Sequence, residues 1–205
     1  MKLTIIGNSA AHDECTRLFP EINWELQKEI PGAGTCQNTD GYFLLNDITE
    51  ATSLNDLPQE KPVFINAVSS TLKNLHAPKN VVRFNGWNGF LEHKVWELAG
   101  FISNEAATIL TGLGKQYTVV PDEPGFISAR VIAMIVNEAY YALEEGVSDK
   151  DAIDVAMKLG TNYPYGPFEW EEKIGAKNIY NLLMALYKEN VRYKPATGLA
   201  YKALQ

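Results

Sequence analysis

The sequence contains little that would support a metal centre, a disulfide framework or a membrane anchor. It has two cysteines, neither in a CxxC pair, and its three histidines are not spaced like metal ligands. No apolar run is long enough to cross a membrane, and the N-terminus offers only a strand's length of apolar residues without a small-residue cleavage site. These absences predict no metal site, no membrane association and a reducing, cytoplasmic location.

Basic clusters are missing as well. The formal net charge is −7 over 205 residues, and lysine and arginine form no run. Because non-specific affinity for nucleic acids comes from clustered cations, a nucleic-acid partner is not expected. Small molecules or other proteins are the expected partners. The apolar fraction of 46% suits a packed core in one generous domain or two small ones.

The first 120 residues alternate short apolar runs with polar segments. Apolar runs bounded by turn residues predict strands at Leu3–Gly7, Gly41–Asn46, Lys61–Val68, Asn80–Gly86 and Gln116–Val120. Residues 103–113 are helix-like, and residues 32–35 are predicted to form a loop. The runs are nearly continuous rather than alternating, which is typical of strands covered on both faces. We therefore predict an α/β domain over residues 1–120, with a short Rossmann-like, mostly parallel sheet.

From residue 121 onward the pattern is helical. Residues Phe126–Gly146 are apolar around most of the helix circumference, which predicts a buried helix that Gly146 ends. Ser148 is the expected cap of a second, short helix that ends at Gly160. Two prolines and a glycine exclude a helix at residues 162–168, and helical periodicity resumes at residues 169–174 and 178–189. Residues 121–205 are therefore predicted to be an all-α domain.

Several ordered segments of the helical part carry a further signal. They are Asp122-Glu123-Pro124-Gly125-Phe126-Ile127, Asn137-Glu138-Ala139, Asp154–Gly160, Tyr163-Pro164-Tyr165-Gly166-Pro167-Phe168-Glu169 and Arg192-Tyr193-Lys194-Pro195. In order and spacing they resemble the helical domain of the 3-hydroxyacyl-CoA dehydrogenases, including 3-hydroxybutyryl-CoA dehydrogenases, which act in fatty acid metabolism. The resemblance implies a Rossmann-type domain followed by a helical domain like the C-terminal domain of 6-phosphogluconate dehydrogenase. It also implies a homodimer through the helical domain, NAD as cofactor and an acyl-CoA ligand held in the interdomain cleft.

The cofactor turn that the resemblance implies is altered. A pyrophosphate on a Rossmann sheet needs GxGxxG after the first strand, so that backbone amides and a helix N-terminus approach the phosphates. Gly7, Asn8 and Ser9 stand at this turn and are the candidate NAD-binding residues. The first glycine is kept, but the second position carries a side chain. Asp13 and Glu14 are expected near the helix start, where they would repel a pyrophosphate.

The catalytic dyad that the resemblance implies is also incomplete. In the family, a histidine oriented by a glutamate takes the hydroxyl proton. The segment Arg83-Phe84-Asn85-Gly86-Trp87-Asn88 resembles the one that ends in this histidine, so an amide, which is no base, occupies the position at Asn88. The resemblance assigns the glutamate to Glu97 and the substrate-binding serine to Ser69. Glu97 also fits an ordinary strand-edge carboxylate, and Ser69 a strand-end cap.

Two further family positions have lost their polar side chains. Ala67 stands where the resemblance implies an asparagine at the nicotinamide end, and Ala129 where it implies an asparagine that holds the substrate's oxygen. His93, four residues before Glu97, is the candidate substitute base. A solvent-exposed loop histidine is the alternative interpretation of His93.

Three hypotheses about function follow. The first is a pseudoenzyme, a binding or regulatory protein that uses the interdomain cleft for a CoA thioester or a similar metabolite. The second is an active NAD-dependent 3-hydroxyacyl-CoA oxidoreductase with a remodelled site. The third is a dimeric scaffold protein without a ligand. The loss of the cofactor turn, the base and the substrate asparagine favours the first.

Overall fold

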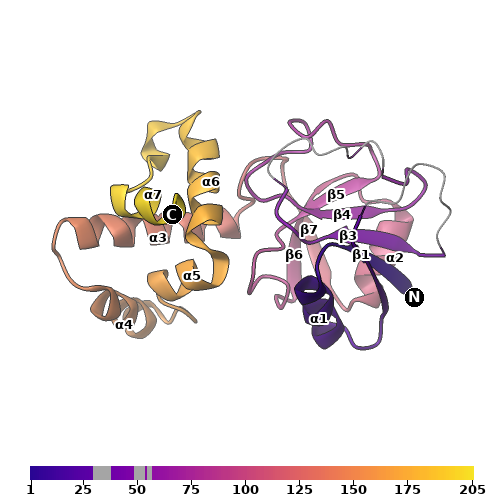
Figure 1. Cartoon of the computed structure of the whole chain (residues 1–205), viewed down its shortest axis with the longest axis horizontal. Coiled ribbons are helices and arrows are strands. Elements are labelled where there is room, and N and C mark those ends of the chain that lie inside the picture. The colour runs from indigo at the N-terminus through magenta and orange to yellow at the C-terminus, as the bar shows by residue number, and fades with distance from the viewer. Residues whose placement is uncertain (30–37, 49–53, 55–56) are drawn as a thin grey trace. The chain divides into compact units, whose positions relative to one another are not determined.

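The computed structural model describes residues 1–29, 38–48, 54 and 57–205, and it divides into two units, Met1–Phe126 and Ile127–Gln205 (Figure 1). The loop expected at residues 32–35 lies outside the described residues. The division falls between residues 126 and 127, whereas the sequence places the boundary between residues 120 and 121. The intervening segment is tied to the first unit, because Gly125 N donates to the carbonyl of Val68 at 2.8 Å.

Among the described residues, the first unit is built on a seven-stranded sheet with the order β2-β1-β3-β4-β5-β6-β7. The strands are β1 Lys2–Ile6, β2 Asn23–Gln27, β3 Gly41–Leu44, β4 Val63–Asn66, β5 Val81–Phe84, β6 Val95–Gly100 and β7 Gln116–Val119. The first five are parallel, β6 is antiparallel to β5, and β7 is parallel to β6. The predicted mostly parallel α/β sheet is confirmed. The sequence analysis did not predict β2, whose residues alternate in polarity because it is an edge strand with one exposed side.

Two helices cover one face of the sheet, α1 (Ser9–Leu18) and α2 (Asn104–Gly112). Beneath them lies an aromatic core. The rings of Phe43 and Phe64 stack with centroids 4.6 Å apart, as do those of Phe84 and Trp96 at 5.2 Å. Such pairs add about 0.5–1.5 kcal/mol to the free energy gained by burial, so this face is held by aromatic contacts across neighbouring strands.

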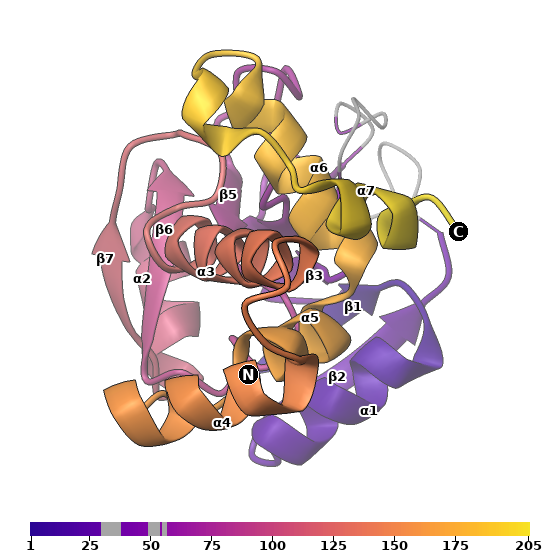
Figure 2. The ribbon, with the colours of Figure 1, turned by 90° about the vertical axis from the view of Figure 1, so that its left-hand side faces the viewer.

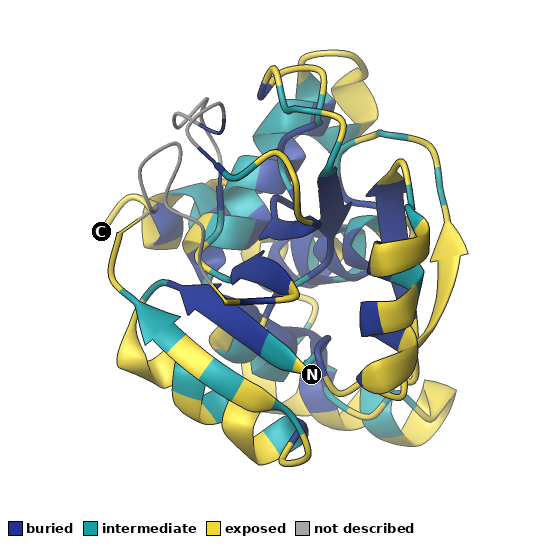
Figure 3. Ribbon diagram, turned by 90° about the vertical axis from the view of Figure 1, so that its right-hand side faces the viewer, coloured by how far each residue is buried: buried dark blue, intermediate teal, exposed yellow. Residues whose placement is uncertain are grey.

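The opposite face is covered by connecting segments. The apolar residues that these segments bury against it include Ile48, Leu54, Leu57 and Leu75. Strands β3, β4 and β5 are consequently buried at every position, which explains why apolar residues fill most of their positions, Asn66 and Arg83 being the polar exceptions. Figure 3 shows the contrast between these buried strands and the exposed edge strands β2 and β7.

A buried arginine ties the end of the first unit to the sheet. Arg83, fully buried on β5, donates to the carbonyls of Ser70 and Glu123 and forms an ion pair with Asp122 at 3.3 Å. Its guanidinium lies 4.4 Å from the centre of the Phe126 ring. Burial lowers the pKa of Arg83 to about 10, so the side chain stays charged at neutral pH. Asp122 also accepts hydrogen bonds from two backbone N–H groups of the segment after β4.

The second unit is all-α, as predicted (Figure 2). Its helices are α3 Ser128–Glu144, α4 Lys150–Thr161, α5 Pro167–Ile174, α6 Ala176–Tyr187 and α7 Thr197–Ala203, with a 3-10 turn at Val191–Tyr193. The central helix α3 contacts α5, α6 and α7, whereas α4 packs on α5. The expected cap of α4 at Ser148 is wrong. Asp149 caps this helix, because its carboxylate reaches Ala152 N at 2.9 Å and also complements the helix dipole.

The Pro-Gly-Pro turn before α5 is held by a side chain of α4. The carboxylate of Asp154 accepts hydrogen bonds from Phe168 N at 2.8 Å and Glu169 N at 3.2 Å, and so caps α5 from outside. Gly166 lies directly against it, since a Cβ at this position would stand 2.3 Å from Asp154 Cγ. The glycine of this motif is therefore required by packing.

We expect Gly166→Ala to lower the free energy of unfolding by about 2–3 kcal/mol, because the added methyl group displaces the capping carboxylate of Asp154. Urea denaturation followed by circular dichroism measures the loss. Gly160→Ala is the matched control, since a Cβ at Gly160 in α4 meets no atom within 4 Å and should be neutral or stabilise by up to about 1 kcal/mol. Equal stability of Gly166→Ala and the parent protein would contradict this role.

Candidate functional site

The topology brings the predicted site residues to one edge of the sheet. The carboxyl ends of β1, β3, β4 and β5 share an edge because these strands are parallel, and the antiparallel β6 begins there. Residues 7–9 follow β1, Ser69 follows β4, Asn88 lies between β5 and β6, and His93 and Glu97 lie at the start of β6. Ligands of doubly wound sheets bind at this edge, next to the reversal of strand order, which falls here between β1 and β3.

The turn after β1 is closed by its own side chains. Asn8 is the N-cap of α1, and its Oδ1 accepts a hydrogen bond from Ala11 N at 3.0 Å. Ser9 opens the helix where the family motif needs its second glycine, and a half-buried His12 stands at the third. Because those glycines let the backbone approach a pyrophosphate and the helix approach the strand, this turn does not fit a dinucleotide.

The two acids of α1 lie further along the helix than predicted. Asp13 and Glu14 are its fifth and sixth residues, and its first turn holds no acid. The prediction that they flank the helix start was wrong, because the helix begins immediately after its Asn8 cap. Asp13 is exposed and lies 3.6 Å from His12 Nδ1.

An asparagine side chain joins the ends of three neighbouring strands. Asn66, buried at the end of β4, donates from Nδ2 to the carbonyl of Leu45 at 3.0 Å and accepts from Gly86 N at 3.0 Å. A Cβ at Gly86 would lie 2.9 Å from the Asn66 side chain, so the contact is close. Asn66 thus forms hydrogen bonds with backbone groups that follow β3 and β5, so these groups are not free to bind a ligand at this edge. Sequence reasoning missed it, although an amide that closes the apolar run Val63–Ile65 was the available signal.

A buried carboxyl group lies beyond β3. Burial raises the pKa of Asp47 to about 6, and a hydrogen bond from Val68 N at 3.4 Å opposes the shift. Its Oδ2 is buried and has no hydrogen-bond partner among the described residues. At neutral pH Asp47 is therefore mostly ionised. This negative charge disfavours a phosphate group close to Asp47.

The positions to which the resemblance assigns the family dyad hold an exposed amide and a half-buried carboxylate. Asn88 is exposed in the loop after β5. Phe84 of β5 lies opposite Leu98 of β6, so Glu97 lies level with Asn85, just past the end of β5. Since neighbouring strand residues face opposite ways, Glu97 faces away from the sheet side that carries Leu98 and the two helices.

Ser69 and His93 lie at the same edge in different surroundings. Ser69 is half-buried and follows Val68, whose carbonyl binds Gly125 N. His93 is exposed, its carbonyl accepts from Lys115 Nζ at 2.9 Å, and its ring centre lies 5.0 Å from that of Phe90. The roles assigned to Ser69, Glu97 and His93 remain predictions.

In the part of the chain that the structure describes, the histidine, cysteine, aspartate and glutamate side chains form no group of three or more that is suited to hold a metal ion. The helices of the same part include none that combines the length and apolar character needed to cross a membrane.

Comparisons with known proteins identify the second unit. The model of the 3-hydroxyacyl-CoA dehydrogenase C-terminal domain matches residues 125–202. A 3-hydroxyadipyl-CoA dehydrogenase of Escherichia coli is 42% identical over 105 residues, which cover 50% of this chain and 22% of that protein. A 3-hydroxybutyryl-CoA dehydrogenase of Bradyrhizobium diazoefficiens is 41% identical over 85 residues, which cover 40% of this chain and 29% of that protein.

A solved structure is similar over most of the chain. The (S)-3-hydroxybutyryl-CoA dehydrogenase of Ralstonia eutropha aligns with a TM-score of 0.69 over 98% of this chain and 92% of that one, at 18% identity, which shows a shared fold. The chain spans less than a third of the length of the two curated relatives, and its sequence match to the family model lies in the helical unit. Residues 125–202 are therefore identified as a 3-hydroxyacyl-CoA dehydrogenase C-terminal domain.

Proposed function

We propose that this protein is a non-catalytic member of its family that binds a CoA thioester or a similar acyl-CoA metabolite. The observation that carries the proposal is the contrast between the two units. The helical unit matches the family model over residues 125–202, whereas the sheet unit has an altered turn and an amide at the position of the base. A protein that keeps the scaffold of an enzyme but lacks its reactive groups is best interpreted as one that binds a ligand without converting it.

The residues of the sheet edge argue against NAD chemistry. The Asn8 cap uses one of the N–H groups that a helix N-terminus offers to a phosphate, and Ser9 adds a side chain where the backbone would have to approach. The amide of Asn88 has no basic lone pair with which to take a hydroxyl proton. Ala129, fully buried in the first turn of α3, offers no polar group to a substrate.

The same edge retains groups that suit an acyl thioester. Ser69 is half-buried and provides a hydroxyl donor next to the end of β4. Asn85 Nδ2 and Trp87 Nε1 are buried donors without a partner among the described residues. A buried unpaired donor costs about 1–3 kcal/mol, so a carbonyl oxygen that reached either group would gain free energy.

Acetoacetyl-CoA should raise the midpoint of thermal unfolding, because a ligand that binds only the folded state stabilises it. At about 100 times its dissociation constant the gain is roughly 2.7 kcal/mol, or several degrees, and differential scanning fluorimetry measures it. Ser69→Ala should weaken binding about fivefold through loss of one hydrogen bond. Ser148→Ala in the helical unit is the matched control and should leave binding unchanged.

Two outcomes would contradict the proposal. Oxidation of NADH in the presence of acetoacetyl-CoA, lost in His93→Ala, would establish the remodelled oxidoreductase. No thermal shift with acetoacetyl-CoA or free CoA would favour the scaffold without ligand.

We also propose that the helical unit pairs with a second copy of the chain through α4. Val155 and Leu159, four residues apart on one face, are exposed, and the exposed Ala152 and Ala156 complete a stripe of apolar residues. Leu159 is 84% exposed, which is costly for an isolated chain in water. Small alanine side chains allow a partner helix to approach closely.

Light scattering after size-exclusion chromatography should give the mass of two 22.8 kDa chains for the parent protein and of one chain for Leu159→Glu. A buried carboxylate at the pairing helix would be desolvated without a partner. Leu204→Glu is the matched control, since this leucine is 74% exposed outside α4, and it should remain a dimer. A monomeric parent protein, or a dimeric Leu159→Glu variant, would contradict pairing through α4.

A further inference from the structure

The segment that connects β4 to β5 carries the hydroxyl group of the proposed acyl-CoA site near its start. Ser69 lies just after the end of β4 and is half-buried. In the described part of the chain, its hydroxyl has no hydrogen-bond partner. A hydroxyl on a connecting segment is aimed at a ligand only when the backbone that carries it is fixed. The contacts that fix this segment are therefore candidates for a role in binding.

The backbone on both sides of Ser69 is held by residues that are distant in sequence. Before it, the carbonyl of Val68 accepts a hydrogen bond from Gly125 N at 2.8 Å. After it, the carbonyl of Ser70 accepts a hydrogen bond from the buried guanidinium of Arg83. All these residues belong to the sheet unit. The chain is thus anchored on both sides of the hydroxyl.

Asp122 joins these contacts into one network. Its Oδ1 accepts a hydrogen bond from Leu72 N at 3.1 Å, and its Oδ2 accepts one from Lys73 N at 3.2 Å. The same carboxylate lies 3.3 Å from the guanidinium of Arg83. A carboxylate that binds two successive backbone N–H groups fixes the course of the chain there. Asp122 therefore holds the backbone that follows Ser69 both directly and through Arg83.

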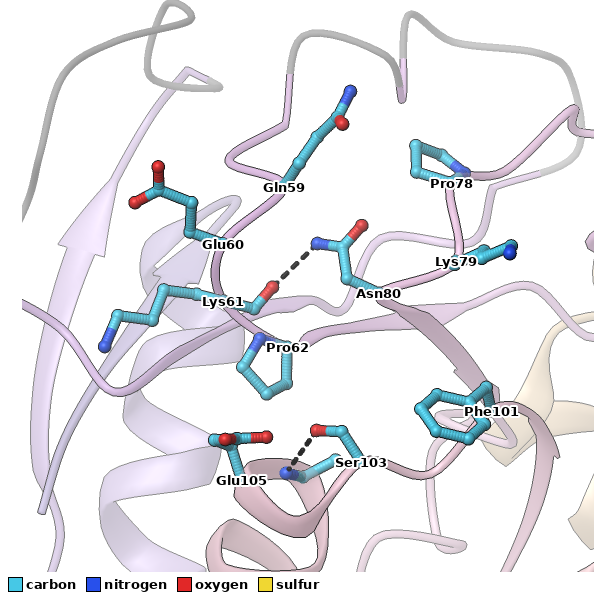
Figure 4. Close-up of a pocket in the computed structure, with 11 residues that line it drawn as sticks. Gln59, Glu60, Lys61, Pro62, Pro78, Lys79, Asn80, Phe101, Ser103 and Glu105 are labelled. Carbon is cyan, nitrogen blue, oxygen red and sulfur yellow. Dashed lines mark hydrogen bonds between the residues drawn. The ribbon is translucent and has the colours of Figure 1, made fainter.

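The far end of the same segment is anchored at the opposite edge of the sheet. Asn80 Nδ2 donates to the carbonyl of Lys61 at 2.7 Å (Figure 4) and to that of Pro58 at 2.9 Å. Asn80 also lines a cavity of about 620 Å³, and Ser69 is not among the residues that line it. The contacts of Asn80 thus hold the segment without reaching the proposed site. Asn80 provides a comparison for Asp122 that separates general anchoring from positioning.

The surroundings of Ser69 suit the uncharged part of a CoA thioester. Asp47 Oδ1 accepts a hydrogen bond from Val68 N at 3.4 Å, so a carboxylate lies close to the residue that precedes Ser69. Burial raises the pKa of Asp47 to about 6, so this carboxylate is mostly ionised at neutral pH. It repels a phosphate group, whereas the carbonyl of an acyl group carries no net charge. The acyl end of the ligand therefore fits the Ser69 hydroxyl better than the nucleotide end.

We propose that Asp122 is a positioning residue, which holds Ser69 where its hydroxyl donates to a carbonyl oxygen of the acyl group. This inference rests on the proposed binding of an acyl-CoA metabolite. Asp122 does not touch the ligand and acts through the backbone around Ser69. Because free CoA lacks the acyl group, Asp122 contributes to the preference for an acyl-CoA over free CoA.

A double-mutant cycle on the full chain tests whether Asp122 acts through Ser69. Isothermal titration calorimetry with acetoacetyl-CoA measures the affinity of the parent protein, Asp122→Asn, Ser69→Ala and the variant with both changes. Asp122→Asn should weaken binding about three- to fivefold and no more than Ser69→Ala does, since one hydrogen bond to the ligand is misplaced. In the Ser69→Ala background, Asp122→Asn should have no further effect.

Three controls separate positioning from a general loss of structure. Asn80→Ala should lower the free energy of unfolding but leave the affinity for acetoacetyl-CoA unchanged, and Asp122→Asn should leave the affinity for free CoA unchanged. Asp122→Glu keeps the negative charge near Arg83 but displaces the carboxylate from Leu72 N and Lys73 N, so it should weaken acetoacetyl-CoA binding as Asp122→Asn does. It replaces Asp122→Asn in the cycle if that variant does not fold. Amide hydrogen exchange at residues 72 and 73 should be faster in both Asp122 variants.

The outcomes distinguish the failure of this inference from the failure of the proposed function. If the parent protein does not bind acetoacetyl-CoA, the proposed function and the positioning role both fail. If it does bind, three results would each overturn the positioning role alone. They are unchanged affinity in the Asp122 variants, a further loss of affinity in the Ser69→Ala background, and an equal loss of affinity for free CoA or in Asn80→Ala.

Discussion

The buried charge of Arg83 is the constraint on which the first unit depends. A guanidinium without access to water is costly unless most of its donors are paired. Here the two terminal nitrogens reach a carboxylate and two carbonyls, and an aromatic face lies against the group, whereas Nε is buried without a hydrogen-bond partner among the described residues. The partners come from the segment after β4 and from residues 122–126. One side chain therefore holds the chain that leaves β7 against the middle of the sheet, which explains why the first unit extends to Phe126.

A second buried polar side chain shapes the edge where ligands of such sheets bind. The Asn66 side chain makes hydrogen bonds with a backbone carbonyl after β3 and a backbone N–H after β5. The Asn8 side chain accepts a hydrogen bond from a backbone N–H in the first turn of α1. These contacts pair part of the polar backbone at this edge, and the ionised Asp47, nearby in the chain, adds negative charge. The physical features that make a Rossmann edge attractive to a pyrophosphate are thus satisfied internally or reversed in sign. The helical unit, in contrast, matches the family model over residues 125–202, and within it Gly166 lies directly against the Asp154 side chain.

The sequence predicted those features that depend on local pattern. Short apolar runs predicted the buried strands β3 and β4. Apolar residues around most of the helix circumference predicted the buried helix α3. Edge strand β2 was missed because its alternating NWELQ pattern is short, and Asp149 rather than Ser148 caps α4 because side-chain reach decides between adjacent candidates. The resemblance led to Ser69, Asn88 and Glu97, which the topology brings to one edge. The role of Asn66 was not predicted, because its hydrogen bonds join residues distant in sequence that only the fold brings together.

The most direct test of the claim that this edge has lost its dinucleotide site is a titration with NADH, followed by the emission of the bound nicotinamide. Energy transfer from tryptophan would report binding. We predict no saturable binding. Saturable NADH binding that Asn8→Asp weakens by charge repulsion would contradict the claim and restore the carboxyl edge as a cofactor site.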